Sequence, residues 1–272
     1  ERLLHPIIDQ KAVDTQNEVV KEEKKLRMDN APYGKVIYGD VYKHLFDNHN
    51  YGRPMIGYIK DLDAATLDEF QDFYDKWYMP NNAVLVVAGD FKKTDAKTWI
   101  KDYFSPIPKR KETKRVIIVE KERILEKRVK EYDANIQLPL LGMAYKTPSF
   151  KQRDAKILDV ISTVLSNGKS SRLYKKLVDD KKIALQAFSF SRPLEDYSVY
   201  IIGSILAGGT SADALIEEID EEILKLQTEL ISDDDLQKVR NQFENQFVAA
   251  NSSVRGIATS LARNYILGGD TN

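Results

Sequence analysis

The first half of the chain alternates segments of helical spacing with short breaks. Residues 11–29 are rich in charge and carry a sparse apolar stripe, which predicts a charged helix. Residues 31–34 (Ala-Pro-Tyr-Gly) end this helix, because proline cannot continue the hydrogen-bond ladder. A second helix is expected over residues 33–46, before a loop over residues 47–57. The apolar positions of the first helix are Val13, Val19, Val20 and Leu26.

A third helix and the clearest strand of the chain follow. Asp63 is the expected N-cap of a helix whose apolar, mostly aromatic face should pack against a core. After Pro80 stops that helix, residues 83–88 are apolar on both faces and predict a central strand of a sheet. A short helix is expected over residues 94–104, and residues 105–112 are the best linker candidate, with two prolines among several charges. The apolar face of the third helix comprises Leu67, Phe70, Phe73, Tyr74 and Trp77.

The second half of the chain groups its strands and helices instead of alternating them strictly. This segregation favours the α+β class over a doubly wound α/β fold. Ser232 is expected to begin the last helix through a capping box. The expected strands cover residues 114–132, 134–146, 183–192 and 196–206, and the expected helices cover residues 151–166, 170–181, 211–229 and 233–250.

Composition excludes several functional classes. Among the 272 residues, 41 basic side chains balance 42 acidic ones, and the net charge is −1. This leaves no basic surplus for binding nucleic-acid phosphates, and no clustered basic face for a membrane surface. No apolar run approaches the roughly 20 residues that span a bilayer. Because the chain has no cysteine, disulfides, thiolate catalysis and cysteine-ligated metals are excluded.

The residues alone display no complete active site. The turn Gly168-Lys169-Ser170 lacks the glycine that a phosphate-binding loop requires five positions earlier, where Thr163 stands. The three histidines, His5, His44 and His49, form no H-x-x-E-H or related zinc motif, so each is best interpreted as an isolated surface residue. No G-x-S-x-G nucleophile motif is present, and nothing singles out a catalytic pair among the 42 acids.

One pair of polar residues on the first predicted helix has two possible interpretations. Gln16 and Glu23 are seven residues apart, nearly two turns, so they share a helix face with Val19 and Val20 between them. A carboxylate on a partly apolar face needs a partner, and a metal ion is one such partner. The alternative is a solvated charge on an exposed helix. Spacing alone does not decide between them.

A series of short motifs resembles the insulinase/pitrilysin family of zinc metallopeptidases. Each motif is weak alone, but together they occur in the order of the family and cover nearly the whole chain. They are Val19-Val20-Lys-Glu-Glu23, Asp29-Asn-Ala-Pro-Tyr-Gly34, Tyr51-Gly-Arg-Pro54 with Gly57, Trp77-Tyr-Met-Pro-Asn-Asn-Ala83 with Val86-Val-Ala-Gly-Asp90, and Ser170-Ser-Arg-Leu-Tyr174.

The resemblance implies an α+β fold of two ferredoxin-like layered subdomains, of which the first is incomplete here. Residues 1–107 would be the carboxy-terminal part of the zinc-site subdomain. Residues 108–272 would be the second, inactive-type subdomain, itself incomplete. In the family, two such two-subdomain units usually close around an unfolded peptide. We therefore expect a second family half, on the same polypeptide or on a partner subunit, and a peptide substrate.

The resemblance also implies a zinc site that this chain only partly contains. The family holds Zn²⁺ with the two histidines of H-x-x-E-H and a glutamate on a downstream helix, and the glutamate within the motif is the general base. Glu23 matches the downstream ligand, and Glu22 is the fallback if the register shifts by one. H-x-x-E-H is expected upstream of Glu1. The chain then resembles a fragment that alone should neither bind zinc tightly nor hydrolyse peptides.

Two departures from the family pattern affect this reading. Many active members carry a supporting glutamate where this chain has Gln16, which keeps a hydrogen-bonding group but loses a charge. Val178 and Leu185 occupy the positions where non-zinc halves often carry an Arg and a Tyr that contact substrate. The chain therefore resembles the zinc half, and the Arg/Tyr pair is expected on the second half.

Two rival functions stay open. A non-catalytic homologue with the same fold, serving as a structural or partner subunit, is the first, and Gln16 is the main reason to keep it. A generic α+β binding module is the second. The family analogy alone points to the bacterial periplasm or cell envelope as the location.

Overall fold

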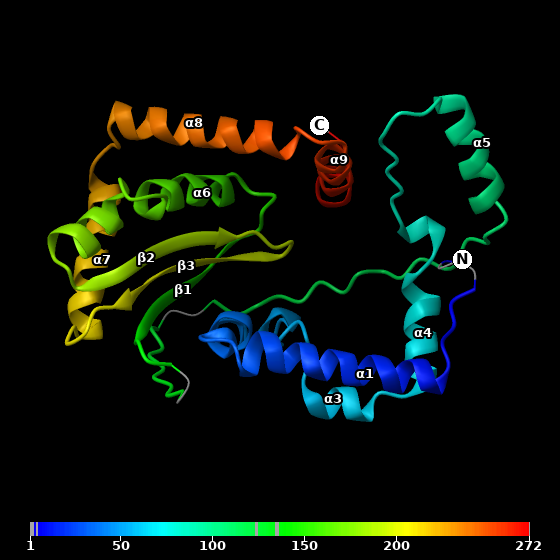
Figure 1. Ribbon diagram of the computed structural model, residues 1–272, viewed down its shortest axis with the longest axis horizontal. Coiled ribbons are helices and arrows are strands. Elements are labelled where there is room, and N and C mark those ends of the chain that lie inside the picture. Colours follow the sequence, from blue (N-terminus) through cyan, green and yellow to red (C-terminus); the bar gives the residue numbers. More distant parts are fainter. Residues whose placement is uncertain (1–2, 4, 123–124, 134–135, 272) are drawn as a thin grey trace. The chain divides into compact units, whose positions relative to one another are not determined.

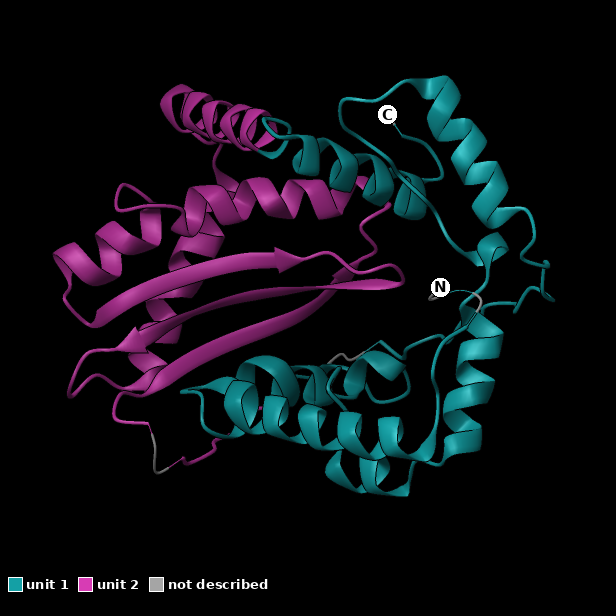
Figure 2. Ribbon diagram, turned by 45° about the vertical axis from the view of Figure 1, so that its right-hand side comes forward, with its two compact units in different colours: residues 1–127, 250–272 teal, residues 128–249 magenta. Residues whose placement is uncertain are grey.

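The computed structural model divides into two compact units (Figure 2). Unit 1 comprises residues 1–127 and 250–272, and unit 2 comprises residues 128–249. The expected boundary between family subdomains, after residue 107, falls within unit 1 and stays a prediction. In the part of the chain that the structure describes, no helix is long and apolar enough to cross a membrane. The described residues are 3, 5–122, 125–133 and 136–271.

Unit 2 is built on a three-stranded antiparallel sheet in the order β1–β3–β2 (Figure 1). The central strand, β3 (Tyr197–Leu206), pairs with β1 (Leu140–Pro148) and β2 (Ala184–Arg192). Helix α6 and the π-helix η5 follow β1 and pack against β2. The helical elements are α6 (Arg153–Ser166), η5 (Tyr174–Asp180), α7 (Ala212–Thr228) and α8 (Asp233–Ala250).

The sequence predicts this unit well. The bounds of β2, β3, α6, α7 and α8 agree with the expected ones within about two residues. The Ser232 hydroxyl accepts a hydrogen bond from the Asp235 N–H (3.1 Å), as expected at the start of α8. The expected helix over residues 170–181 is instead largely π-helical, a difference that apolar spacing does not reveal.

The core of unit 2 fills the space between the sheet and its helices. Tyr200, Ile202 and Leu206 stand at even positions of β3, so they point to the same face and meet the helices there. Most of the remaining β3 residues are buried as well, and β3 has a paired strand along each of its two edges. The core cluster comprises Leu165, Leu173, Leu177, Ala184, Ala187, Tyr200, Ile202, Leu206, Leu215 and Ile219.

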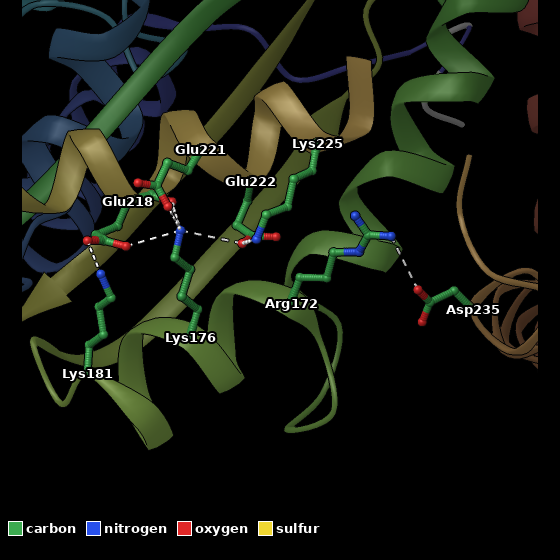
Figure 3. A network of polar contacts seen from close by, with 8 residues as sticks. All are labelled: Arg172, Lys176, Lys181, Glu218, Glu221, Glu222, Lys225 and Asp235. Carbon is green, nitrogen blue, oxygen red and sulfur yellow. Dashed lines mark hydrogen bonds and ion pairs between the residues drawn. The ribbon is translucent and has the colours of Figure 1, made fainter. Parts of the chain in front are cut away.

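An ion-pair network fastens η5 to α7 (Figure 3). The Lys176 ammonium lies 2.7 Å from a carboxylate oxygen of Glu221, 3.1 Å from one of Glu218 and 3.4 Å from one of Glu222. Lys181 adds a second ion pair to Glu218, and Lys225 pairs with the buried Glu222 at 2.7 Å. Three carboxylates within about one turn of α7 thus converge on a single cation from η5.

We expect Lys176→Met to lower the free energy of unfolding by about 2 kcal/mol, because it leaves buried Glu222 with only part of its counter-charge. Hydrogen bonds from Lys181 and Lys176 lower the pKa of Glu218. A carboxyl group with a lowered folded pKa adds stability above its unfolded pKa, and this is lost as the pH falls through the folded value. Urea titrations at pH 7 and at acid pH should therefore show a smaller difference between variant and parent at acid pH. Glu221→Gln, at an exposed carboxylate, is the matched control and should change stability far less.

Unit 1 is mainly helical. Its first helix, α1 (Gln10–Lys24), begins at Asp9, whose carboxylate accepts a hydrogen bond from the Ala12 N–H at 2.7 Å. A π-helical turn follows, and the chain then turns at Gly34, where a Cβ would lie 2.5 Å from the carbonyl oxygen of Arg27. The other elements are η1 (Lys25–Asp29), η2 (Val36–Asp40), α2 (Val41–Leu45), η3 (Asn50–Gly52), α3 (Ile59–Ala64), α4 (Leu67–Trp77), η4 (Pro80–Asn82), α5 (Lys93–Phe104) and α9 (Val254–Gly268).

The prediction that Asp63 caps the third helix is wrong. Asp63 lies within α3 and forms an ion pair with Lys21 at 2.6 Å. The next helix, α4, begins after Thr66, whose hydroxyl accepts from the Glu69 N–H while the Glu69 carboxylate accepts from the Thr66 N–H. This complete Thr-x-x-Glu capping box satisfies two donors at once, and it therefore places the start of α4.

The prediction of a central strand over residues 83–88 is also wrong for the described chain. The segment is extended but unpaired, and the side chain of Leu85 is exposed. A strand needs a neighbour, and all strands among the described residues belong to unit 2. The aromatic face of α4 does not pack against a core as expected, because no residue of α4 is buried.

The first strand of the second half begins later than expected. Residues 114–132 are unpaired where they are described, and pairing starts at Leu140. Residues 123–124 and 134–135, which the two expected strands include, lie outside the described residues. Helix α9 was not expected from the sequence. Its caps are regular, because the Ser253 hydroxyl accepts from the Gly256 N–H and the left-handed Gly269 ends it.

Candidate functional site: the exposed face of α1

One side of α1 is fixed to the rest of unit 1. Val13 is buried, and the side-chain amide of Asn17 donates to the carbonyl oxygen of Leu62 at 3.0 Å. Lys21 continues the same side through its ion pair with Asp63 of α3. Because positions four apart share a helix face, these three side chains define the packed side of α1.

Gln16, Val19 and Glu23 follow a different stripe of α1. Gln16 and Val19 are exposed, and the side chain of Glu23 keeps 44% of its surface accessible. Their spacing of three and four residues places them along one face, as the sequence predicts. Glu23 is therefore open to a ligand, and no burial in the core accounts for a carboxylate here.

The carboxylates of Glu22 and Glu23 have local cationic neighbours. Glu23 pairs with the Arg27 Nε at 2.9 Å, one turn on, and Glu22 pairs with the Lys25 ammonium at 2.6 Å. Ion pairs of this kind on exposed helices contribute about 0.5 kcal/mol or less. A divalent cation held by further ligands could displace Arg27 from Glu23 at little cost.

The described residues do not complete a zinc site around Glu23. None of their His, Asp and Glu side chains form a group of three or more that could hold a metal ion. The His44 Nδ1 lies 2.9 Å from the Lys127 ammonium. The expectation of a surface residue is wrong for His49, which is buried with its ring centroid 4.0 Å from that of Tyr51. A zinc site needs three protein ligands or more, so Glu23 fits zinc only as one ligand among others.

The motif over residues 170–174 has a structural role. In the Ser-Arg-Leu-Tyr segment, Leu173 is fully buried in the core of unit 2, and the Arg172 guanidinium lies 3.5 Å from the Asp235 carboxylate of α8 (Figure 3). Val178 packs partly against the same core, and Leu185 sits exposed in the bulge of β2. Neither position offers a polar group to a substrate.

Comparison with known proteins identifies the family. Residues 64–243, about two thirds of the chain, match the family described as "Peptidase M16 inactive domain". The chain belongs to the M16 peptidase family. The matched residues include both parts of the expected division after residue 107, and Glu23 lies outside them.

Individual M16 relatives extend this likeness over nearly the whole chain. "Zinc protease PqqE" of Helicobacter pylori is 31% identical over 93% of the chain and 58% of its own length. A crystal structure of a protease from Helicobacter pylori has a TM-score of 0.83 at 28% identity, over 96% of this chain and 63% of that one. The first half of the periplasmic protease PqqL from Escherichia coli shares the fold, with a TM-score of 0.70 at 17% identity, over 98% of this chain and 58% of that one.

These figures confirm the expected α+β fold of the insulinase/pitrilysin type, to which the M16 relatives belong. Within the described residues, unit 1 lacks the sheet of its layered subdomain. The chain spans about three fifths of the length of the relatives it matches.

Proposed function

We propose that this chain is part of a zinc metallopeptidase that hydrolyses peptides or unfolded polypeptides. The observation that carries the proposal is the match to a named zinc protease over 93% of the chain. Bound zinc would supply Lewis-acid chemistry that activates water and polarises the peptide carbonyl. Within this chain, Glu23 contributes one carboxylate ligand from the accessible face of α1, and Gln16 lies on the same face as its neighbour in the outer shell.

The surface of unit 1 supports burial under further polypeptide. Several large apolar side chains of its extended segments are exposed, among them Leu85, Val116 and Ile117. Large exposed apolar side chains on extended segments of this kind support an interaction with further polypeptide. We propose that additional family sequence covers it and brings the two histidines and the general base of H-x-x-E-H to Glu23. A second family half carrying an Arg/Tyr pair would then hold the substrate.

A non-catalytic subunit of the same fold is the second candidate. Gln16 favours it, because an active site gains from a charged group at this position. The match to a domain described as inactive is compatible with both candidates. The resemblance implies such a domain as the second subdomain beside the zinc-site subdomain. A periplasmic or cell-envelope location is part of either proposal.

Zinc stoichiometry separates the two candidates. The 272-residue chain and a polypeptide extended about 100 residues upstream would be purified without chelator and their metal content measured by plasma mass spectrometry. We expect close to one zinc per molecule in the longer protein and little in the shorter one, because Glu23 alone is too few ligands. No zinc in the longer protein would contradict the peptidase proposal and favour the non-catalytic subunit.

A further inference from the structure

A buried carboxylate lies in a segment of unit 1 that is otherwise open to solvent. Glu120 retains only 7% of its accessible surface, whereas its neighbours Val116, Ile117 and Val119 retain 74–78%. This is the reverse of the usual preference. Apolar side chains are usually buried, whereas glutamate is almost never buried without a compensating partner. The burial of Glu120 therefore requires a specific partner.

Three consecutive backbone N–H groups are that partner. Asp47 donates to one carboxylate oxygen of Glu120 at 3.1 Å. Asn48 and His49 donate to the other oxygen at 2.9 and 2.8 Å. Successive N–H groups that turn toward one point form an anion-binding nest, and hydrogen bonds to an ionised carboxylate are stronger than neutral ones. Glu120 thus fills a nest about seventy positions earlier in the chain.

Packing on both sides of the nest restricts the conformation of the loop that forms it. Phe46 is buried ahead of it, and Gly52 beyond it lies so close that a Cβ would be 2.5 Å from the carbonyl oxygen of Phe46. His49 Nδ1 accepts a hydrogen bond from the Tyr51 N–H at 3.1 Å, and the rings of these two residues lie against each other. The ends of the loop are thereby fixed, and the three N–H groups between them need an acceptor.

We propose that Glu120 is a clip that joins two parts of unit 1, the loop over residues 47–52 and the extended segment over residues 108–122. Near its start the segment is held by two hydrogen bonds between Arg110 and Asn81. The segment has no strand pairing, and the loop would expose three converging donors without a carboxylate. Because Glu120 joins the loop to the segment, the order of each part depends on the other. Loss of order in one part therefore loosens the other part as well. It also fixes the segment to unit 1 beyond residues 105–112, the linker expected from the sequence.

The test compares Glu120→Gln with Glu122→Gln in the full chain. The amide of glutamine keeps one acceptor oxygen but turns donor hydrogens toward N–H groups, so at least one of the three bonds is lost. Glu122 is exposed two residues away, and the same substitution there leaves the nest intact. The measurements are amide hydrogen exchange resolved to residues 47–49 and the rate of tryptic cleavage after Lys121.

In Glu120→Gln we expect exchange at residues 47–49 and cleavage after Lys121 both to rise about 10-fold or more, because one charge-assisted bond suffices for that factor. Glu122→Gln should behave as the unchanged protein. Exchange in α1 shows whether unit 1 of the variant is still folded. If it is not, Glu120→Asp, whose side chain is too short to reach all three donors, gives the same comparison. Unchanged exchange at residues 47–49, or a rise at only one of the two parts, would overturn the clip. Neither readout involves zinc or activity, so the result is independent of the proposed function.

Discussion

Gly203→Ala should strongly destabilise the sheet of unit 2. Gly203 lies in the middle of β3, where an added Cβ would be 2.2 Å from the carbonyl oxygen of Leu141 on β1 and 2.9 Å from the ring of Phe188 on β2. The ring could rotate away, but the carbonyl belongs to the pairing of β1 with β3, and moving it breaks that pairing. Because β3 is also the central strand of the core, we expect a loss of about 3 kcal/mol or more in the free energy of unfolding.

Gly142→Ala is the matched control for this substitution. Gly142 pairs directly with Gly203 across the two strands, but its added Cβ would meet only a Leu140 methyl at 3.8 Å, an ordinary contact. We expect it to change stability by less than about 1 kcal/mol, in the stabilising direction through the entropy of the unfolded chain. Urea unfolding followed by circular dichroism measures both. Equal stabilities of the two variants would show that β1 can move away from β3 without loss.

The contrast between the two units explains how much the sequence could predict. In unit 2 the partners of each apolar pattern lie nearby in the chain. Strand β3 finds β1 and β2 within about 60 residues, and the apolar sides of α6 and α7 close on the same sheet. The pattern and the fold therefore agree to within about two residues for most of its elements. The π-helical register of η5 is an exception, because the spacing of its apolar residues is also that of an α-helix.

In unit 1 the pattern indicates surfaces that the described chain does not cover. The apolar segment over residues 83–88 has the composition of a central strand, yet its backbone has no strand partner. The aromatic face of α4 is likewise exposed at Phe73. The pattern specifies what a segment needs to pack against, and the structure decides whether that partner is available.

The same limit applies to the candidate site residues. The shared face of Gln16 and Glu23 follows from their spacing, whereas their exposure and the ion pair of Glu23 with Arg27 come from the structure. The role of Glu23 as a ligand came from the family resemblance. Glu120 had no signal at all, because it is one of 42 acidic residues and its partners are backbone groups, which every residue has.

Glu23→Gln in the intact protein should lower zinc occupancy and peptidase activity together. If Glu23 is the third zinc ligand, the substitution removes an anionic oxygen from the metal, and we expect zinc affinity to fall by about 100-fold or more, since even outer-shell partners contribute 10- to 100-fold. The fold should survive, because Glu23 is half-exposed and its pair with Arg27 contributes little. Zinc content by mass spectrometry and cleavage of an unfolded polypeptide are measured on the same preparation.

Glu22→Gln supplies the matched control, since Glu22 lies one residue earlier, on a different side of α1, and pairs with Lys25. If Glu23 is the ligand, this variant keeps both zinc and activity. The opposite result, zinc lost from Glu22→Gln and kept by Glu23→Gln, would move the ligand by one residue and leave the peptidase proposal standing. Full zinc and activity in both variants would remove α1 from the metal site, and its exposed carboxylates would then be ordinary helix charges.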